Sequence, residues 1–292
     1  MDLNYIKSKF VEISGFDHLT LVGITITISS IISVFCLELI IIGWKNSSIK
    51  RLFKFDKSIQ NDLYYTLLDI FNIYNIIAFI ITLGFFYILS SILQKNIHFN
   101  LISYIKNPFL QFVIIYLLID LKNYTVHFVF HRYYSLWKIH EFHHSATKMN
   151  ILTSYRNHFF VKGISSIFDV LFLVVIGAPL LTFLSLQILQ EIHRLIIHSS
   201  IKSNWGIIGK YILVSPLAHQ VHHSINPVQA NKNFGSTFIF WDKIFRTYYT
   251  PCEVIEYGLP NNPYNKKGFI YDCILVVKNT LISIFKSKRK NS

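Results

Sequence analysis

Long apolar runs constrain this chain most, because a backbone that crosses a bilayer can do so only as a helix or within a closed barrel. Residues 19–44 form one such run, and residues 73–93 form a second. Each is at least as long as the roughly 20 apolar residues that a transmembrane helix needs. A third run begins at Pro108, a residue favoured at helix starts, and becomes polar from Asp120 onward. We therefore expect an all-α integral membrane protein with three transmembrane helices, the third over about 109–126.

The composition supports lipid as the solvent for much of the chain. Of its 292 residues, 52% are hydrophobic and 15% are charged, whereas soluble domains carry about 25% charged residues. In a soluble protein, the formal net charge of +13 would favour a nucleic-acid partner. Here the basic residues gather in stretches such as 44–57 and 286–292, which is typical of juxtamembrane Lys and Arg. We expect no nucleic-acid partner.

The cysteines and the N-terminus exclude two further classes. Cys36, Cys252 and Cys273 lie far apart and are odd in number, which argues against a disulfide framework and a zinc ribbon. The N-terminus lacks the basic start, short apolar core and small-residue cleavage site of a removable signal. The first apolar run is therefore expected to be a retained membrane anchor.

Two further apolar segments are interrupted. The region 164–197 is too short for two full spans, which need about 40 residues, and it is broken at Gly177–Pro179. A single span would put the histidines at its two ends on opposite sides of the membrane. We therefore expect a short membrane hairpin over about 164–192. The segment 269–285 contains Asp272 and Lys278, which favours an amphipathic helix lying on the membrane or on the protein.

Basic residues also predict the orientation. The stretch 45–57 carries five lysines and arginines, whereas the connection 94–107 carries two lysines. Positive charge favours the cytoplasmic side. We therefore expect a multi-pass protein whose histidine-rich region forms a helical cap on the cytoplasmic face.

Histidines are concentrated in one part of the chain. Eleven of the 13 lie between 127 and 223. Positions i, i+3 and i+4 share one face of a helix, so each motif is expected to present its imidazoles toward a common point, as a metal site requires. We interpret the isolated His18 and His98 as core or interface residues. The motifs are H-x3-H at His127 and His131, H-x2-H-H at His140, His143 and His144, the pair His193 and His198, and H-x2-H-H at His219, His222 and His223, with His158 between.

The number of histidines predicts more than one metal ion. The motifs supply at least nine, whereas a zinc ion takes about four ligands, so two ions are the smallest sensible number. Imidazole suits Zn, Cu, Fe and Ni better than hard, oxygen-seeking cations. Glu141, Asp120 and Glu191 lie near the motifs and are expected to orient imidazole N–H groups from outside the ligand set.

The order of these motifs after transmembrane segments resembles the fatty acid hydroxylase/sterol desaturase superfamily of membrane non-haem di-iron enzymes. The segments "SPLAHQVHHSINP" (215–227) and "NKNFGSTFIFWDKIFRTYYTP" (231–251) also match its pattern. The resemblance covers about 110–260 and is nearest to the alkylglycerol monooxygenase-like and bacterial sterol desaturase-like branch. It divides the chain into a membrane anchor region, 1–107, and a catalytic region, 108–292.

The resemblance implies a set of residues that bind two iron ions. His193 is a further candidate, although it lies five residues before His198, where relatives often have a ligand about four before. His158, in an R-x-H element, is expected beside the ligands, and Trp241 and Asp242 are expected to be structural. The implied ligands are His127, His131, His140, His143, His144, His198, His219, His222 and His223.

The same resemblance implies an O2-dependent enzyme that hydroxylates or desaturates a fatty acyl, sterol or ether lipid. Its electrons would come from a cytochrome, a ferredoxin or a reduced pterin. Zinc would be able to replace iron during purification, since imidazole binds both. Two alternatives stay open: a membrane transporter or store of metal ions, and an inactive scaffold that retains the site.

Overall fold

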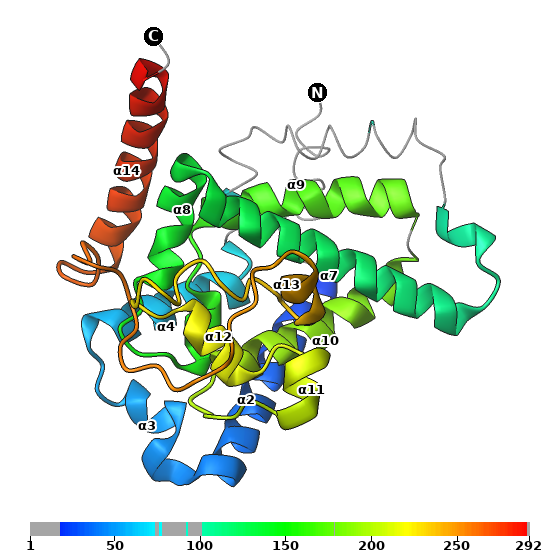
Figure 1. Ribbon diagram of the computed structural model, residues 1–292, viewed down its shortest axis with the longest axis horizontal. Helices are drawn as coiled ribbons and strands as arrows, with labels where there is room; N and C mark the ends of the chain where they lie inside the picture. The colour runs from blue at the N-terminus through cyan, green and yellow to red at the C-terminus, as the bar shows by residue number, and fades with distance from the viewer. Residues whose placement is uncertain (1–17, 74–75, 78–91, 93–100, 178, 291–292) are drawn as a thin grey trace. The chain divides into compact units, whose positions relative to one another are not determined.

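The computed structural model describes residues 18–73, 76–77, 92, 101–177 and 179–290 (Figure 1). These residues form helices and loops with two isolated β-bridges and no strands. The first helices are α2 (His18–Asn46), α3 (Ser48–Leu52), α4 (Lys57–Ile70), the 3-10 helix η1 (Leu101–Tyr104), α7 (Pro108–Arg132) and α8 (Tyr134–His144). They are followed by η2 (Ile151–Tyr155), α9 (Phe159–Ile176), α10 (Leu180–His198), α11 (Gly206–Tyr211), α12 (Pro216–His222), α13 (Phe240–Ile244) and α14 (Phe269–Lys290).

Two helices are long and apolar enough to cross a membrane: Leu21–Asn46 within α2, and α7. The helix α7 begins at Pro108, as predicted, and the Asn107 side chain accepts hydrogen bonds from the N–H groups of Phe109 and Leu110. The predicted second span, 73–93, lies for the most part outside the described residues. The described residues are therefore helical and include two candidate membrane spans, and the total of three spans stays a prediction.

The break expected at Gly177–Pro179 separates α9 from α10. Gly177 adopts a φ of 68°, a left-handed conformation that glycine tolerates because it has no Cβ. The membrane hairpin that we expect over 164–192 stays a prediction.

The chain divides into two compact units. The first comprises Met1–Ser30, Leu67–Ile119 and Phe159–Leu189, and the second comprises Ile31–Thr66, Asp120–His158 and Gln190–Ser292. The second unit contains all eleven histidines of the window 127–223. The first unit has an apolar core formed by Ile102, Ile115, Ile119, Ile176, Phe183 and Leu186.

A fully buried ion pair organises the second unit. The Arg156 guanidinium donates to the Asp62 carboxylate at 3.0 Å and to the Phe142 carbonyl oxygen at 3.2 Å. It also donates to the Ser145 hydroxyl at 3.0 Å and to the Asn265 side chain. These bonds tie α4 and the segment before α14 to the C-terminal end of α8, the helix that carries three of the histidines.

A second buried carboxylate connects α2 to the end of α10. Glu38 is buried and accepts hydrogen bonds from the backbone N–H groups of Ser48 and Ser200, both at 2.6 Å, and from the Ser48 hydroxyl at 2.8 Å. Ser200 lies two residues after His198. The only acidic residue of the first apolar run therefore holds the backbone beside one of the histidines.

We expect Arg156→Leu to lower the free energy of unfolding by about 3–5 kcal/mol, because it leaves the Asp62 carboxylate buried without its counter-charge. Thermal unfolding in detergent measures this. The control is Lys202→Leu, which removes a 3.0 Å pair with Glu253 in which both side chains are exposed, and which should cost at most about 1 kcal/mol. Equal losses in the two variants would contradict the organising role of the buried pair.

Candidate metal centre

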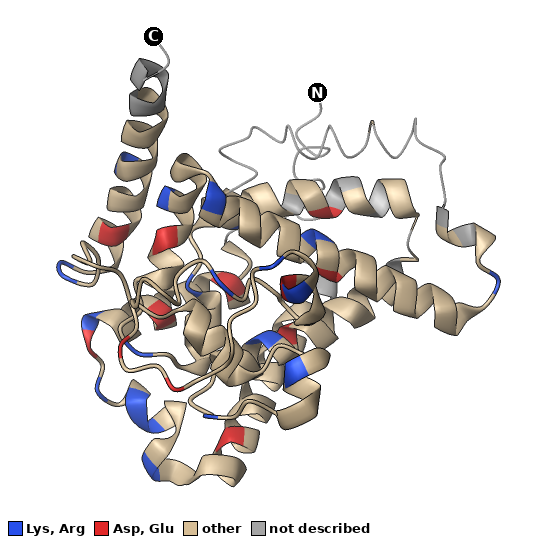
Figure 2. Cartoon of the chain, viewed as in Figure 1, with Lys and Arg blue, Asp and Glu red and all other residues tan. Residues whose placement is uncertain are grey.

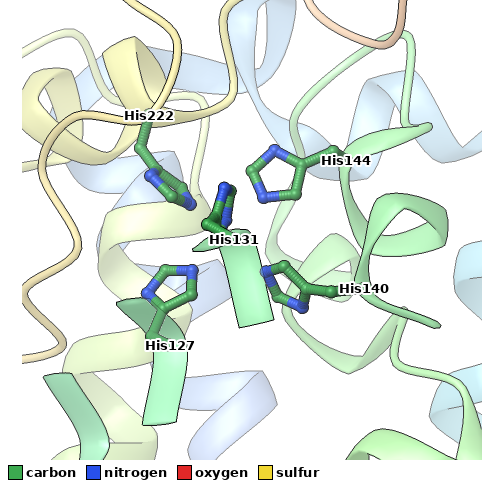
Figure 3. Close-up of side chains that lie close together, drawn as sticks. All are labelled: His127, His131, His140, His144 and His222. Atoms are coloured by element: carbon green, nitrogen blue, oxygen red, sulfur yellow. The ribbon is translucent and has the colours of Figure 1, made fainter. Parts of the chain in front are cut away.

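Two groups of histidines in the second unit could each hold a metal ion. Within each group, the ligand nitrogens all lie within 4.8 Å of one another. Figure 3 shows the rings of the first group pointing toward a common centre. The first group is His127, His131, His140, His144 and His222, and the second is His143, His198, His219 and His223. Together they contain the nine histidines that the family resemblance implies as ligands.

Each H-x2-H-H motif is divided between the two groups, which differs from the common point that we expected for each motif. In α8, His140 and His144 belong to the first group and His143 to the second. In the motif at the end of α12, the division is reversed: His219 and His223 belong to the second group and His222 to the first. Positions i and i+4 differ by only about 40° around a helix, whereas i+3 lies about 60° to the other side. The motif spacing therefore lets one turn of helix serve two adjacent sites.

Short elements with clear start and end signals carry these motifs. The helix α12 begins with Ser215, whose hydroxyl accepts a hydrogen bond from the Ala218 N–H at 3.2 Å, followed by Pro216 at its first position. His198 is the last residue of α10, and its Nδ1 lies 2.8 Å from the Arg194 carbonyl oxygen. Because each motif sits at a helix end, loops can reach the imidazoles from the side.

The nitrogen spacing in the second group fits a shared cation. The Nε2 atom of His198 lies 3.4 Å from His143 Nε2 and 3.0 Å from His219 Nε2. His219 Nε2 lies 3.2 Å from His223 Nε2. Neighbouring ligands on one ion with metal–nitrogen bonds of about 2.1 Å are about 3.0–3.4 Å apart. These separations are those of ligands around a single ion.

In the first group, the protein fixes the tautomer of three imidazoles. His127 Nδ1 lies 2.9 Å from the Phe234 carbonyl oxygen, and His222 Nδ1 lies 2.8 Å from that of Lys232. His131 Nδ1 lies 3.2 Å from the Asn231 side-chain oxygen. Since these oxygens only accept, each Nδ1 carries the proton and each Nε2 keeps a free lone pair. All three Nε2 atoms are buried without a hydrogen-bond partner. In metal-ligating histidines, one ring nitrogen likewise donates to an acceptor and the other is free to bind the metal.

Burial keeps the imidazoles neutral in the seven histidines of the two groups that do not lie in α7. Burial lowers the pKa of His198 to about 3. It lowers the pKa of the six histidines in the H-x2-H-H motifs well below the ordinary value, and neighbouring imidazoles add to this effect. Neutral imidazole is the form that binds metal. Those six histidines are His140, His143, His144, His219, His222 and His223.

The loop 231–235 supplies the oxygens for the first group and is itself held by Asp242. The Asp242 carboxylate accepts hydrogen bonds from the N–H groups of Phe234 at 2.7 Å and Gly235 at 2.8 Å. A Cβ at Gly235 would lie 2.9 Å from the Asp242 Oδ2 atom and 2.8 Å from the Phe238 carbonyl oxygen, so only glycine permits this approach. This is a physical reason for the N-F-G and W-D-K-I-F sequences that follow the last histidine motif.

Aromatic rings cover the first group. The Trp137 ring centroid lies 4.8 Å from that of His131 and 5.2 Å from that of His144. The Phe234 ring lies 5.0 Å from His131 and 5.5 Å from His222. These apolar rings exclude water from one side of the site.

Two further histidines lie in neither group. The His193 ring packs against Trp205, with centroids 5.6 Å apart, and burial lowers the pKa of His193 to about 4. Burial lowers the pKa of His158 to about 3, offset in part by a hydrogen bond with the backbone of Cys273 in α14. A ligand role for His193 and a place for His158 beside the ligands stay predictions.

The three carboxylates expected to orient imidazoles have other partners. Glu141 accepts hydrogen bonds from Lys138 at 2.8 Å and Tyr264 at 2.9 Å. Glu191 accepts from Tyr155 and Arg194. Asp120 accepts from the N–H groups of Thr237 at 2.9 Å and Phe238 at 3.0 Å. The oxygens that we observe beside imidazole nitrogens are backbone carbonyls and one amide oxygen, and the orienting role of the three carboxylates stays a prediction. Sequence reasoning missed the carbonyls because every residue carries one, so they leave no signal in the sequence.

Part of this chain is similar in sequence to known proteins. The alkylglycerol monooxygenase of Caenorhabditis elegans is 33% identical over 129 residues, which are 44% of this chain and 25% of the relative. That of Xenopus tropicalis is 29% identical over 163 residues, 54% of this chain and 35% of the relative. The ornithine lipid hydroxylase OlsE of Rhizobium tropici is 26% identical over 147 residues, 50% of this chain and 44% of the relative. No solved structure matches the chain significantly.

The matched stretches thus span less than half the length of each of these relatives. The sequence model of the fatty acid hydroxylase family matches residues 112–247, a stretch that contains all nine histidines of the two groups. Residues 112–247 of this chain are therefore similar to the fatty acid hydroxylase family, in agreement with the resemblance of the histidine motifs.

Proposed function

We propose that this chain is a membrane-bound non-haem di-iron oxygenase that uses O2 and external electrons to hydroxylate, or to desaturate, a lipid. The observation that carries this proposal is the pair of adjoining groups, built from histidines alone, that could each hold a metal ion. The names of the relatives, monooxygenase and hydroxylase, support the same class of reaction.

The donor set favours iron over hard cations, because both groups offer nitrogen ligands and no carboxylate. Bound iron would supply the activation of O2 and the removal of hydrogen from an unactivated C–H bond. The nine histidines would hold the two ions, and the loop 231–235 would keep His127, His131 and His222 in the ligating tautomer. Trp137 and Phe234 would keep water from the first ion.

A lipid substrate fits the place of the site on the chain. His127 and His131 lie in the last turns of α7, a candidate membrane span, so a lipid could enter from the bilayer with its head group at the interface. Two relatives are named for alkylglycerols and for an ornithine lipid. For this chain we propose a fatty acyl, sterol or ether lipid, with the site on the cytoplasmic face and electrons from a cytochrome, a ferredoxin or a reduced pterin.

Metal analysis of detergent-purified protein tests the site. We expect two ions per chain, one for each group. His222→Ala should remove mainly the ion of the first group and His143→Ala mainly that of the second, so each single variant should keep about one ion and the double variant none. Mass spectrometry of the purified proteins measures the content.

The control is His193→Ala, which changes a buried histidine outside both groups and should leave two ions. Loss of an ion in this variant would make His193 a ligand. Full retention of metal in His222→Ala and His143→Ala would contradict the two-ion site.

We expect Asp242→Asn to weaken metal binding at the first group by about 10- to 100-fold, because the amide offers one acceptor oxygen where the carboxylate holds two N–H groups. Metal content after dialysis against increasing chelator measures the loss. The control is Asp120→Asn, another buried carboxylate that accepts two backbone N–H groups, and it should leave the first group unchanged. Equal effects would mean that the loop 231–235 does not control the ligands.

Oxygen isotope transfer tests the reaction. With 18O2, iron-loaded protein, a chemical reductant and extracted membrane lipids, we expect a lipid product that carries one 18O atom. A product lacking two hydrogens without label would indicate desaturation instead. Absence of any product, with two ions bound and O2 not consumed, would favour an inactive scaffold. Transport of metal across vesicles by the unmodified chain would favour the transporter.

A further inference from the structure

The helix α14 presents a largely polar face to the protein. Asp272, Val276, Thr280 and Ser283 are all buried, and their spacing of four, four and three residues places them on one face of the helix. Specific bonds hold this face inward: the Asp272 carboxylate accepts from the Asn61 side chain at 2.7 Å and from the Asn265 N–H at 2.9 Å. The rotation of α14 about its own axis is therefore determined by its contacts.

The opposite face of α14 is apolar and exposed. Ile270 is 71% exposed, Ile274 61%, Leu281 50% and Phe285 66%. Figure 2 shows few charged residues along the described part of this helix. A surface helix in a soluble protein has the reverse arrangement, with its apolar stripe against the core. We call these four residues the outer stripe of α14.

The outer stripe is unusually long for an apolar surface in water. From Ile270 to Phe285 the helix rises about 22 Å at 1.5 Å per residue. On one side the exposed Lys278 separates the stripe from the exposed Tyr271 and Ile282, and a lysine at this border can bury its aliphatic stem while its ammonium group stays in water. Contiguous apolar patches beyond a few hundred Å² mark interaction or membrane sites.

We propose that α14 lies in the membrane interface, with its outer stripe in the lipid and its C-terminal end bound to anionic head groups. This goes beyond the proposed enzyme function and requires only that the chain is a membrane protein. The sequence that follows the stripe, "KSKRK" at 286–290, carries four basic residues in five. Clusters of this kind beside an amphipathic helix attract anionic lipids.

A bilayer fits this face better than a second copy of the chain. Pairing of two helices uses a narrow seam, whereas a broad apolar face suits an extended lipid surface. Parallel pairing would also bring the four basic residues of one copy close to those of the other. The chain already contains two helices that could cross a membrane, so a bilayer is available to α14.

The test is the depth of fluorescent labels in lipid nanodiscs. An environment-sensitive dye is attached to Ile274→Cys or Leu281→Cys in full-length, metal-loaded protein whose Cys36, Cys252 and Cys273 are replaced. The control is Ile255→Cys, a fully exposed isoleucine between Glu253 and Glu256. Unchanged metal content verifies that each labelled protein is folded.

We expect both stripe labels to be quenched by lipids brominated near the head group, and to show several-fold weaker quenching by aqueous iodide than the control. Quenching by iodide equal to that of the control would overturn the proposal. Protection from both quenchers would indicate a protein partner and would also overturn it. Very different depths for the two positions would mean that the helix crosses the bilayer rather than lying along it.

The lipid charge is tested separately. Protection from iodide should be stronger in nanodiscs that contain phosphatidylglycerol than in phosphatidylcholine alone. Replacing Lys286, Lys288, Arg289 and Lys290 by Gln should remove this difference and leave metal content unchanged. Equal protection of the unmodified protein in both lipids would overturn the assignment of an anionic surface.

Discussion

Buried imidazole nitrogens without a protein partner are the constraint on which the second unit depends. All five Nε2 atoms of the first group are in this state, and the four Nε2 atoms of the second group lie 3.0–3.4 Å from their neighbours. Burying polar atoms without partners is costly, and packing alone does not compensate for it. A bound cation in each group would give these nitrogens a partner. The stability of this unit would therefore depend on the proposed metal centre.

Buried carboxylates hold the backbone around that centre. Glu38 accepts from the N–H of Ser200, near the end of α10, and Asp242 accepts from the N–H groups of the loop that contacts His127. Each carboxylate thus binds backbone N–H groups close to a histidine and does not itself belong to either histidine group. This arrangement keeps negative charge out of both groups, so the charge of bound cations would stay available to an oxygen-derived ligand.

Two parts of the chain are expected to contact the membrane: the candidate spans and α14. Candidate spans in α2 and α7 bring apolar surface to the chain, and α7 continues directly into His127 and His131. The helix α14 packs along α8 (Figure 1) and leaves its outer stripe exposed. A lipid-facing helix is thus attached to the element that carries His140, His143 and His144, which is consistent with a substrate drawn from the bilayer.

The sequence by itself determined the helical class, the membrane-spanning runs at α2 and α7, and the nine histidines that gather, because apolar length and helical spacing are local properties. Only the tertiary structure decided that His143 and His222 belong to a different group from the other histidines of their motifs. They point about 60° away around the helix, and which group they face depends on how the neighbouring helices pack. The tertiary structure also decided that the carbonyl oxygen of Phe234 contacts an imidazole. Backbone oxygens are the same at every position, so no residue pattern could reveal which ones the fold would use.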